Sequence, residues 1–214
     1  MRCLLADNRA VRCSVWACYH TDLYLFELEG LLIGVLGCAV GASFAVLVAE
    51  ELFASGCELL LSITSAGQIT ALRDPPYFVL IEKALRDEGT SYHYLPPSDY
   101  SRISEKLLDW LRPNLKSFSP PVEVGSTWTT DAPFRETTSA IDACRKMGLR
   151  AVEMEAAALY AFAEARNKSV ICFAHVTNQM ASIEGDFEKG VENGCRDALQ
   201  LVATVARLRQ NCSK

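Results

Sequence analysis

The apolar residues of this chain gather in runs that are separated by glycines and small polar residues. Near-continuous apolar runs of strand length are typical of strands that are buried on both faces. Three such runs predict interior strands at residues 31–36, 58–63 and 170–176. Residues 42–53 are predicted to form a buried helix that closes at Gly56. Strand, small-residue turn and helix in alternation favour an α/β sandwich with both faces of its sheet covered.

The rest of the pattern predicts shorter elements. Residues 22–29 alternate well enough for a strand that turns at Glu29-Gly30, and residues 77–87 have the apolar spacing of a helix. Residues 1–21 show neither the apolar period of a helix nor that of a strand, and we leave this N-terminal segment unassigned. The remaining predictions are a helix capped by Ser98 that carries Ile103 to Leu111 and ends at Pro113, a polar and aromatic loop at 125–136, a helix at 137–147 with Gly148 as its C-cap, and a last helix at 187–208.

One uncharged stretch raises the alternative of a membrane protein. Residues 31–49 carry no charge, and their number meets the length of a membrane span. Three glycines interrupt the stretch (Gly34, Gly37 and Gly41), and its flanks are acidic rather than basic. A strand, a glycine turn and a buried helix explain the same pattern, so we expect no membrane partner. The first thirty residues also lack the continuous apolar core of a secretory signal.

Composition narrows the class of protein. The chain has 214 residues, of which 50% are apolar, and this favours one compact domain with a sizeable core. The net charge of −5 argues against nucleic acid as the main partner, because phosphate backbones require a basic face. The nine cysteines lack metal-site spacing, and most fall in apolar runs, such as Cys38, Cys57 and Cys172. They predict buried thiols in a reducing cytoplasm and no metal centre.

The most informative stretch is Val-Glu-Met-Glu-Ala-Ala at residues 152–157. Glu153 and Glu155 flank Met154 where an alanine-rich helix is predicted to begin. Glutamates in a first helical turn are commonly solvated charges that favour the positive end of the helix dipole. The alternative is a binding role, since a carboxylate accepts through two oxygens and suits the vicinal hydroxyls of a sugar.

This hexapeptide, the apolar strand after it and the polar pair Thr177-Asn178 resemble the nucleoside phosphorylase superfamily. That family includes purine nucleoside phosphorylase, uridine phosphorylase and the methylthioadenosine-type nucleosidases. The resemblance implies a single-domain, three-layer α/β sandwich with a mixed, curved central sheet flanked by helices, spanning residues 22–214. It also implies that Met154 and Glu155 bind ribose, while Glu153 either assists or only stabilises the loop.

The resemblance extends to a base-binding loop. Thr129-Thr130-Asp131 and Phe134-Arg135-Glu136 resemble the Ser-Ser-Asp…Glu-Arg loop of uridine phosphorylases. By that resemblance Thr130, Phe134 and Arg135 bind the base. An aromatic ring stacks on a base, and a guanidinium donates to a carbonyl oxygen. The alternative is an ordinary surface loop in which Arg135 is solvated.

Asn178 is the candidate catalytic residue and departs from the purine enzymes, which carry an aspartate there as general acid. An asparagine cannot donate and regain a proton over the working pH range. Val-Thr-Asn resembles instead the Val-Asn of uridine phosphorylases, where hydrogen bonds to carbonyl oxygens stabilise the leaving group. The resemblance therefore favours a pyrimidine-like or otherwise keto-rich base, or weak catalysis.

The phosphate site is the poorest match. Residues 62–67 stand where phosphorylases read Arg-x-Gly-[Ser/Thr]-x-Gly, so that Ser65 and Gly67 are retained but Ser62 replaces the arginine. Losing a bidentate guanidinium weakens a site for a dianion. Arg9 or Arg12 could supply the missing charge by folding back.

These residues predict an enzyme that cleaves the N-ribosyl bond of a nucleoside, nominally by phosphorolysis to free base and ribose 1-phosphate. Phosphate would be the co-substrate, with no metal or other cofactor. The alternatives are a nucleosidase that uses water and a catalytically weak nucleoside-binding homologue. The family resemblance also implies a cytoplasmic homo-oligomer, a dimer or a trimer of dimers.

Overall fold

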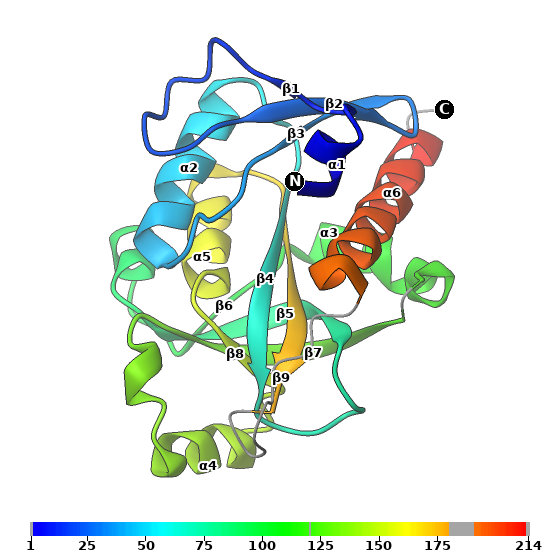
Figure 1. The fold of residues 1–214 in the computed structure, drawn as a ribbon. Helices are drawn as coiled ribbons and strands as arrows, with labels where there is room; N and C mark the ends of the chain where they lie inside the picture. Colours follow the sequence, from blue (N-terminus) through cyan, green and yellow to red (C-terminus); the bar gives the residue numbers. More distant parts are fainter. Residues whose placement is uncertain (1, 120, 180–190, 213–214) are drawn as a thin grey trace.

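The structure of this chain is a computed structural model, and it describes residues 2–119, 121–179 and 191–212. Its elements alternate between strands and helices along most of the chain (Figure 1). In order they are α1 Arg2–Ala6, β1 Val11–Arg12, β2 Tyr24–Leu28, β3 Leu31–Val35, α2 Ala42–Ala54, β4 Leu60–Gln68, β5 Tyr77–Asp87, η1 Thr90–His93, β6 Tyr100–Arg102, α3 Glu105–Leu111, η2 Arg112–Ser117, β7 Val122–Thr130, η3 Pro133–Arg135, α4 Thr138–Lys146, β8 Ala151–Glu153, α5 Ala156–Arg166, β9 Val170–Asn178, η4 Val191–Gly194 and α6 Cys195–Cys212.

The central sheet is mixed and strongly curved, as predicted. Its strand order is β6-β5-β7-β8-β4-β9, and β5 also pairs with β9, so five of the strands close on themselves. This ring contains three parallel pairs (β4–β9, β5–β7 and β7–β8) and two antiparallel ones (β4–β8 and β5–β9). The curvature therefore goes further than an open sandwich and ends in closure.

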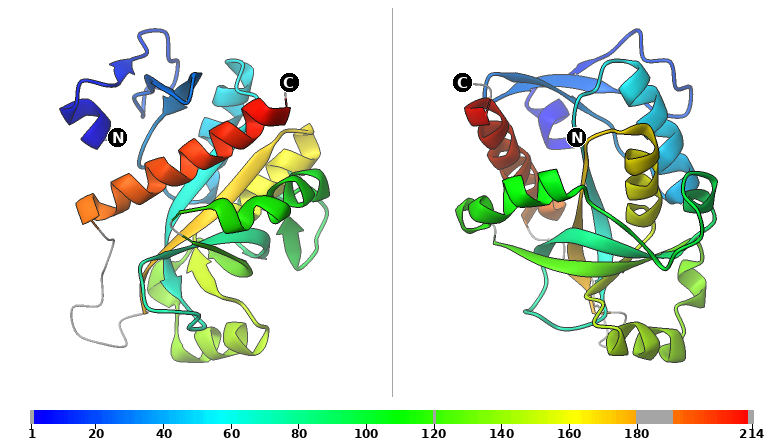
Figure 2. Two further views of the ribbon diagram at one scale, coloured as in Figure 1. Left: turned by 90° about the vertical axis from the view of Figure 1, so that its right-hand side faces the viewer. Right: turned by 180° about the vertical axis from the view of Figure 1, so that it is seen from behind.

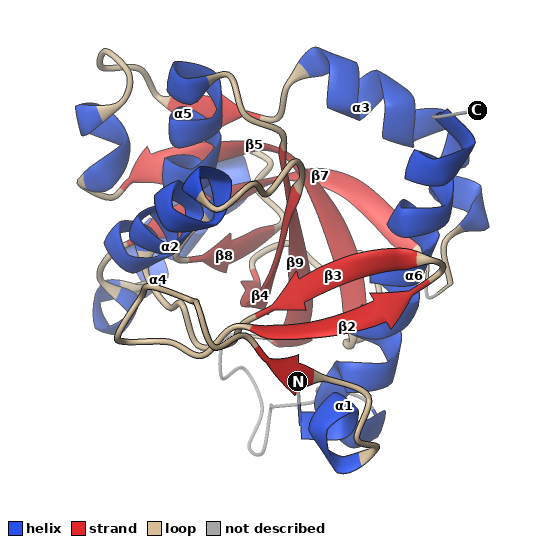
Figure 3. Ribbon diagram, turned by 90° about the horizontal axis from the view of Figure 1, so that it is seen from above, coloured by secondary structure: helices blue, strands red, loops and turns tan. Residues whose placement is uncertain are grey.

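Helices cover the sheet on two sides (Figure 2). α2 and α5 lie together on one side of β4 and β9, and α3 and α6 lie on the other. A separate three-stranded sheet, β1-β2-β3, lies across the end of the molecule where β4 and β9 begin (Figure 3). The predicted fold class, a mixed α/β fold with a curved central sheet flanked by helices, is confirmed.

Two of the three predicted interior strands are confirmed. β4 lies between β8 and β9, and β9 lies between β4 and β5. The third, residues 31–36, is a strand but not an interior one. Among the described strands, β3 pairs with β2 alone, through the turn at Glu29 and Gly30, both with positive φ, and Leu32 is 74% exposed. Short-range hairpin pairing positions this strand and leaves part of its apolar surface open to solvent.

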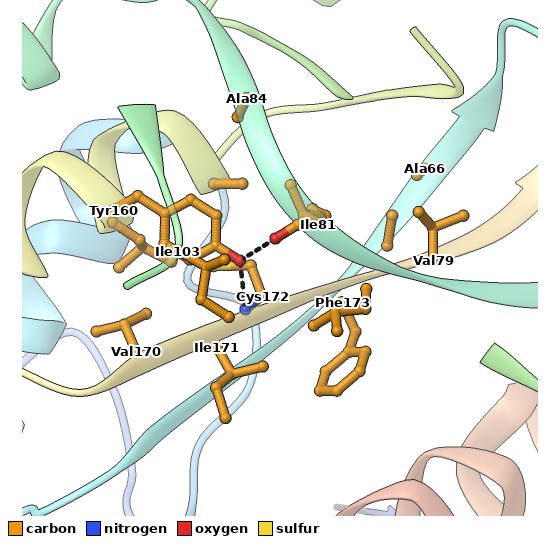
Figure 4. Close-up of a cluster of buried hydrophobic side chains, with 14 of the residues drawn as sticks. Ala66, Val79, Ile81, Ala84, Ile103, Tyr160, Val170, Ile171, Cys172 and Phe173 are labelled. Atoms are coloured by element: carbon orange, nitrogen blue, oxygen red, sulfur yellow. Dashed lines mark hydrogen bonds between the residues drawn. The ribbon is translucent and has the colours of Figure 1, made fainter. Parts of the chain in front are cut away.

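The predicted helix at 77–87 is wrong, because this segment is strand β5. Residues 77–81 are all buried in the main hydrophobic core, together with side chains of α5 and β9. A strand buried on both faces is apolar at successive positions, and such a run also satisfies helical spacing. Figure 4 shows Val79 and Ile81 within the resulting core.

The predicted loop at 125–136 is also largely wrong. Its first half belongs to β7, which pairs with β5 and β8 and whose threonines are buried. Gly125 is required within β7, because a Cβ there would lie 2.6 Å from Cγ of Arg150. Only the part that follows Thr130 is irregular, with the short helix η3.

The predicted helix after Ser98 begins later than expected. Residues 100–102 form strand β6, and α3 is capped by Ser104, whose hydroxyl accepts from the Leu107 N–H at 3.4 Å. The helix at 137–147 is confirmed as α4, followed by Gly148 with φ 78°. The last helix is α6, and residues 187–190 of its predicted range lie outside the described residues.

The uncharged stretch at 31–49 is divided between β3 and α2, as the strand–turn–helix interpretation predicts. Among the described residues, no helix combines the length and the apolar character needed to cross a membrane. The prediction of buried thiols holds for Cys172, but Cys57 is only partly buried and Cys38 is exposed in the segment between β3 and α2, with φ 65°.

Candidate functional site

The two glutamates lie at the junction between β8 and α5. β8 ends at Glu153, Met154 turns the chain, and Glu155 occupies the N-cap position of α5 with φ −132° and ψ −37°. Both carboxylates are almost fully buried, with residue exposures of 2% for Glu153 and 5% for Glu155. The interpretation of these residues as solvated helix-end charges is therefore wrong.

Glu153 is bonded entirely within the protein. Its Oε2 accepts from the backbone N–H groups of Glu155 and Ala156, each at 2.7 Å, at the unpaired start of α5. Its Oε1 accepts from the hydroxyls of Thr127, at 3.0 Å, and Thr129, both in β7. These bonds support the role of stabilising the loop, which was one of the two alternatives for this residue.

The environment of Glu153 raises its pKa to about 7. Burial is the main cause, because it penalises the charged form, and the neighbouring charge of Glu155 adds to the shift. Hydrogen bonds from Thr129 and from the two backbone N–H groups oppose the shift by favouring the carboxylate. Glu153 is thus a buried carboxyl whose charge changes near neutral pH.

Glu155 joins three elements that are distant in sequence. Its Oε1 accepts from the backbone N–H of Gly41, the N-cap of α2, at 2.7 Å. Its Oε2 accepts from the hydroxyl of Thr64 in β4 at 2.5 Å and from the N–H of Met154 at 3.3 Å. Gly41, Thr64 and Met154 are only partly buried, so the carboxylate lies just beneath the surface.

The predicted phosphate and catalytic residues meet on adjacent strands. Ser65 and Thr177 face one another across β4 and β9, with their hydroxyl oxygens 3.0 Å apart. Gly67 is in register with Asn178, after a shift in the pairing at Ala66/Gly67. The Asn178 side-chain amide lies 3.5 Å from the Thr177 hydroxyl. The structure therefore places Ser65, Gly67 and Asn178 together.

Arg12 does not fold back to supply the missing positive charge to this site. Its guanidinium extends from β1 and pairs with Asp22, which precedes β2, with Nε 2.8 Å from the carboxylate. This hydrogen bond and charge pair also raise the pKa of Arg12. Arg9 is exposed between α1 and β1. Ser62, where the family pattern has arginine, is paired with Cys172 inside the sheet.

The predicted base-binding residues do not share one environment. Thr130 ends β7, is buried, and accepts from the Ala132 N–H at 3.2 Å. Phe134 and Arg135 follow in η3, where Phe134 is 100% exposed and Arg135 is also exposed. In a single chain, η3 therefore presents an aromatic ring and a guanidinium at the surface.

Sequence reasoning missed several residues that build the site. In the sequence, Thr64 lies next to Ser65 in a run of small hydroxyl residues, and only this run could have indicated Thr64 as a site residue. Nothing in the sequence pointed to Gly41, which acts through its backbone N–H. A cavity of about 410 Å³ beyond Gly67 was also unforeseen, lined by Gln68, Ile69, Ala71, Thr138, Ile141, Asp142, Arg145 and Gln179.

Comparison with known families agrees with this geometry. Residues 12–207 match the family described as the phosphorylase superfamily. This chain belongs to the phosphorylase superfamily. The match includes the β8–α5 junction with its two glutamates and the ends of β4 and β9.

Among curated relatives, the chain is similar to a DeoD-type purine nucleoside phosphorylase of Shewanella denitrificans. The two are 25% identical over 158 residues, which cover 73% of this chain and 67% of the relative. A DeoD-type purine nucleoside phosphorylase of Streptococcus uberis is 28% identical over 139 residues, covering 64% of this chain and 59% of the relative. The second match thus spans less than two thirds of the relative's length.

Among solved structures, the chain resembles a uridine phosphorylase from Vibrio fischeri with a TM-score of 0.74. The superposition covers 96% of this chain and 83% of the other, at 19% sequence identity. At that level of identity the likeness concerns the fold. It agrees with the mixed, curved sheet and flanking helices described above.

Proposed function

We propose that this chain cleaves the N-ribosyl bond of a nucleoside, with phosphate as the nominal acceptor. The observation that carries the proposal is the Met154–Glu155 junction in a member of the phosphorylase superfamily. There a buried carboxylate next to the partly exposed Met154 accepts from the Thr64 hydroxyl of β4, and the following residue, Ser65, has its hydroxyl 3.0 Å from that of Thr177 in β9. The curated relatives named above are phosphorylases that act on purine nucleosides.

The assigned roles follow from the chemistry of each group. Glu155 accepts from sugar hydroxyls, and Met154 provides an apolar contact with the sugar. Ser65 and the backbone at Gly67 hold the phosphate, because hydroxyls and successive amides bind anions without side-chain charge. Glu153 positions Glu155 by binding its N–H. Phosphate attacks the anomeric carbon as the bond to the base breaks, and the electron pair of that bond leaves with the base.

Thr130, Phe134, Arg135 and Asn178 form the base side of the proposed site. Phe134 stacks on the base and Arg135 donates to a carbonyl oxygen, after η3 moves towards the sheet or meets a neighbouring subunit. The Asn178 amide donates to the leaving base rather than protonating it. These donors favour a base that carries keto oxygens, such as uracil or hypoxanthine, over adenine.

A second candidate function is hydrolysis by water. The observation that favours it is that Ser62 stands where the family pattern has an arginine. In addition, Arg12 forms an ion pair with Asp22. A dianion held by hydroxyls and amides alone is bound weakly compared with one held by a guanidinium. The third alternative is a homologue that binds nucleosides at the same site without turnover, and it yields neither ribose 1-phosphate nor free ribose.

Product identity tests the proposal. Uridine, inosine and adenosine are incubated with the protein, with and without millimolar phosphate, and the sugar product is identified by NMR. Ribose 1-phosphate together with free base supports phosphorolysis, whereas free ribose identifies a hydrolase. Nucleoside binding without either product supports the binding homologue, and no binding of any nucleoside overturns the proposal.

The proposal extends to the oligomeric state and the cellular compartment. We infer a homo-oligomer, a dimer or a trimer of dimers, in which a neighbouring subunit completes the pocket. We also infer a cytoplasmic enzyme without a metal cofactor. Among the residues with described placement, no group of three or more histidine, cysteine or carboxylate side chains is arranged to hold a metal ion.

A further inference from the structure

A cavity adjoins the proposed site where the chain leaves β4 and β9. Its volume is about 410 Å³, which lies in the usual range of small-molecule pockets. Gln68 and Gln179 line it, and they directly follow Gly67 and Asn178, the pair in register at the ends of these strands. α4 supplies further lining residues, at the end of the molecule where β4 and β9 finish (Figure 1). A base held beside Gly67 and Asn178 therefore has this cavity beyond it.

Gln68 presents a donor to this cavity. The residue is only 7% exposed, and its side-chain oxygen accepts from the Tyr77 hydroxyl at 2.7 Å. Burial raises the pKa of Tyr77, so the phenol keeps its proton at neutral pH and acts as the donor. The amide nitrogen of Gln68 has no acceptor among the residues that the structure describes. Since this nitrogen carries two N–H donors, Gln68 offers hydrogen bonds that a ligand or water in the cavity accepts.

The lining on α4 is polar but carries no net charge. Arg145 donates through Nε to the Ile69 carbonyl at 3.1 Å, and it forms an ion pair with Asp142. These two are the charged side chains among the described lining residues, and their charges cancel. Ile69 and Ile141 add apolar surface. A neutral ring with hydrogen-bonding groups on its edge suits this lining better than an anion such as phosphate, because a pocket without net charge does not compensate an anion for its lost water.

We propose that this cavity receives the outer edge of the base, and that Gln68 determines specificity by donating to a keto oxygen there. This inference rests on the proposed function. The bond to the sugar lies at one edge of the base, so the opposite edge points past Gly67 and Asn178 towards the cavity. Tyr77 is a positioning residue, because its bond to the amide oxygen turns the amide nitrogen towards the ligand. A base with an amino group at this edge sets donor against donor and is bound more weakly.

Two matched pairs of nucleosides test the inference: inosine with adenosine, and uridine with cytidine. Within each pair, the outer edge of the base carries a keto oxygen in one member and an amino group in the other. Isothermal titration calorimetry measures the four dissociation constants. The wild type is expected to bind the keto member of at least one pair about tenfold more tightly than the amino member. Gln68→Leu keeps a side chain of similar size and removes the amide, so this preference is expected to fall to about threefold or less.

Tyr77→Phe is the second variant, because it releases the amide of Gln68 without removing it. The keto preference is expected to fall in this variant too, whereas a merely structural role of Tyr77 would weaken both members of a pair by the same factor. Gln200→Leu, on the exposed surface of α6, is the matched control, and the wild-type preference is expected for it. Circular dichroism checks that each variant is folded.

The outcomes separate the inference from the proposed function. A keto preference that persists in Gln68→Leu overturns the inference, as does a wild type that binds nucleosides without such a preference. Failure of the wild type to bind any nucleoside is a different result and overturns the proposed function as well.

Discussion

At the residue scale, the two glutamates of the β8–α5 junction have different surroundings although only Met154 separates them. Glu153 points towards β7 and is bonded by two hydroxyls and two backbone N–H groups. Glu155 points towards β4 and the start of α2. Their backbone conformations differ because the first ends a strand and the second precedes a helix, and this sends the two carboxylates in different directions.

Glu155→Gln tests the ribose assignment. The substitution keeps the shape but exchanges one acceptor oxygen for a donor and removes the charge. Nucleoside affinity is expected to fall by about 1.5–3 kcal/mol, the scale of a hydrogen bond to a charged group. Calorimetric titration measures the change, with Glu164→Gln on the exposed surface of α5 as the matched control. Equal affinity in wild type and Glu155→Gln would remove Glu155 from the sugar site.

The raised pKa of Glu153 predicts a pH dependence of stability. The unfolded carboxyl titrates near 4.5 and the folded one at about 7, so the folded state binds the extra proton between these values. The contribution of Glu153 to the free energy of unfolding therefore falls as pH rises through this window. The expected loss between pH 5 and pH 8 is about 2 kcal/mol.

Urea denaturation of wild type and Glu153→Gln at several pH values measures this loss. Glutamine resembles the protonated acid, because its oxygen can accept from the N–H groups of Glu155 and Ala156 while its amide faces the two threonine hydroxyls. The stability difference between the two proteins should thus change with pH by the amount given above. A constant difference from pH 5 to pH 8 would show that Glu153 does not titrate in this range.

At the element scale, Tyr160 of α5 joins the two strands that close the sheet. The ladder between β5 and β9 ends at Leu80 and Phe173. At the next position the Tyr160 hydroxyl donates to the Ile81 carbonyl at 2.6 Å and accepts from the Cys172 N–H at 3.1 Å (Figure 4). A buried side chain thus satisfies two backbone groups where the strands diverge.

Tyr160→Phe tests this bridge. Loss of the hydroxyl leaves a buried carbonyl and a buried N–H without this partner, and the free energy of unfolding is expected to fall by about 1–3 kcal/mol. Urea denaturation measures the effect. The control is Tyr92→Phe, whose hydroxyl donates to the Arg86 carbonyl from an exposed residue, where water can replace it. Equal effects of the two substitutions would contradict a special role for Tyr160.

At the scale of the whole molecule, the N-terminal sheet carries exposed apolar residues at one end. Leu32 lies on β3, and the others lie on β1 or in the loop that follows it. They are Val11, Val15, Tyr19 and Leu32. Exposed apolar side chains gain free energy when a partner covers them. We therefore expect this end of the molecule to contact a second copy of the chain.

Sedimentation velocity at micromolar concentration tests the assembly. The wild type is expected to sediment as at least a dimer of the 23.6 kDa chain. Leu32→Glu places a charge on the exposed apolar surface and should increase the monomer fraction, since an unpaired charge is costly to bury. Met147→Glu, at the C-cap of α4 at the opposite end of the molecule, is the control. A wild type that is monomeric under these conditions would refute the predicted oligomer.

The sequence by itself determined the parts that depend on local pattern. Long apolar runs between turn residues identified β4, β9 and α2, and the hexapeptide at 152–157 identified the family and the two glutamates. Local pattern failed for β5 and for β7. A strand buried on both faces can be apolar at every position or can bury threonines, and neither shows a period of two.

Only the tertiary structure decided how these parts act on one another. The closure of the sheet depends on pairing between β5 and β9, and the state of Glu155 depends on donors 91 and 114 positions away. A residue's own type sets which bonds it can make, but its partners are set by which elements pack beside it. For that reason the sequence could single out Glu155, whereas its hydrogen bonds from Gly41 and Thr64 became apparent only in the folded chain.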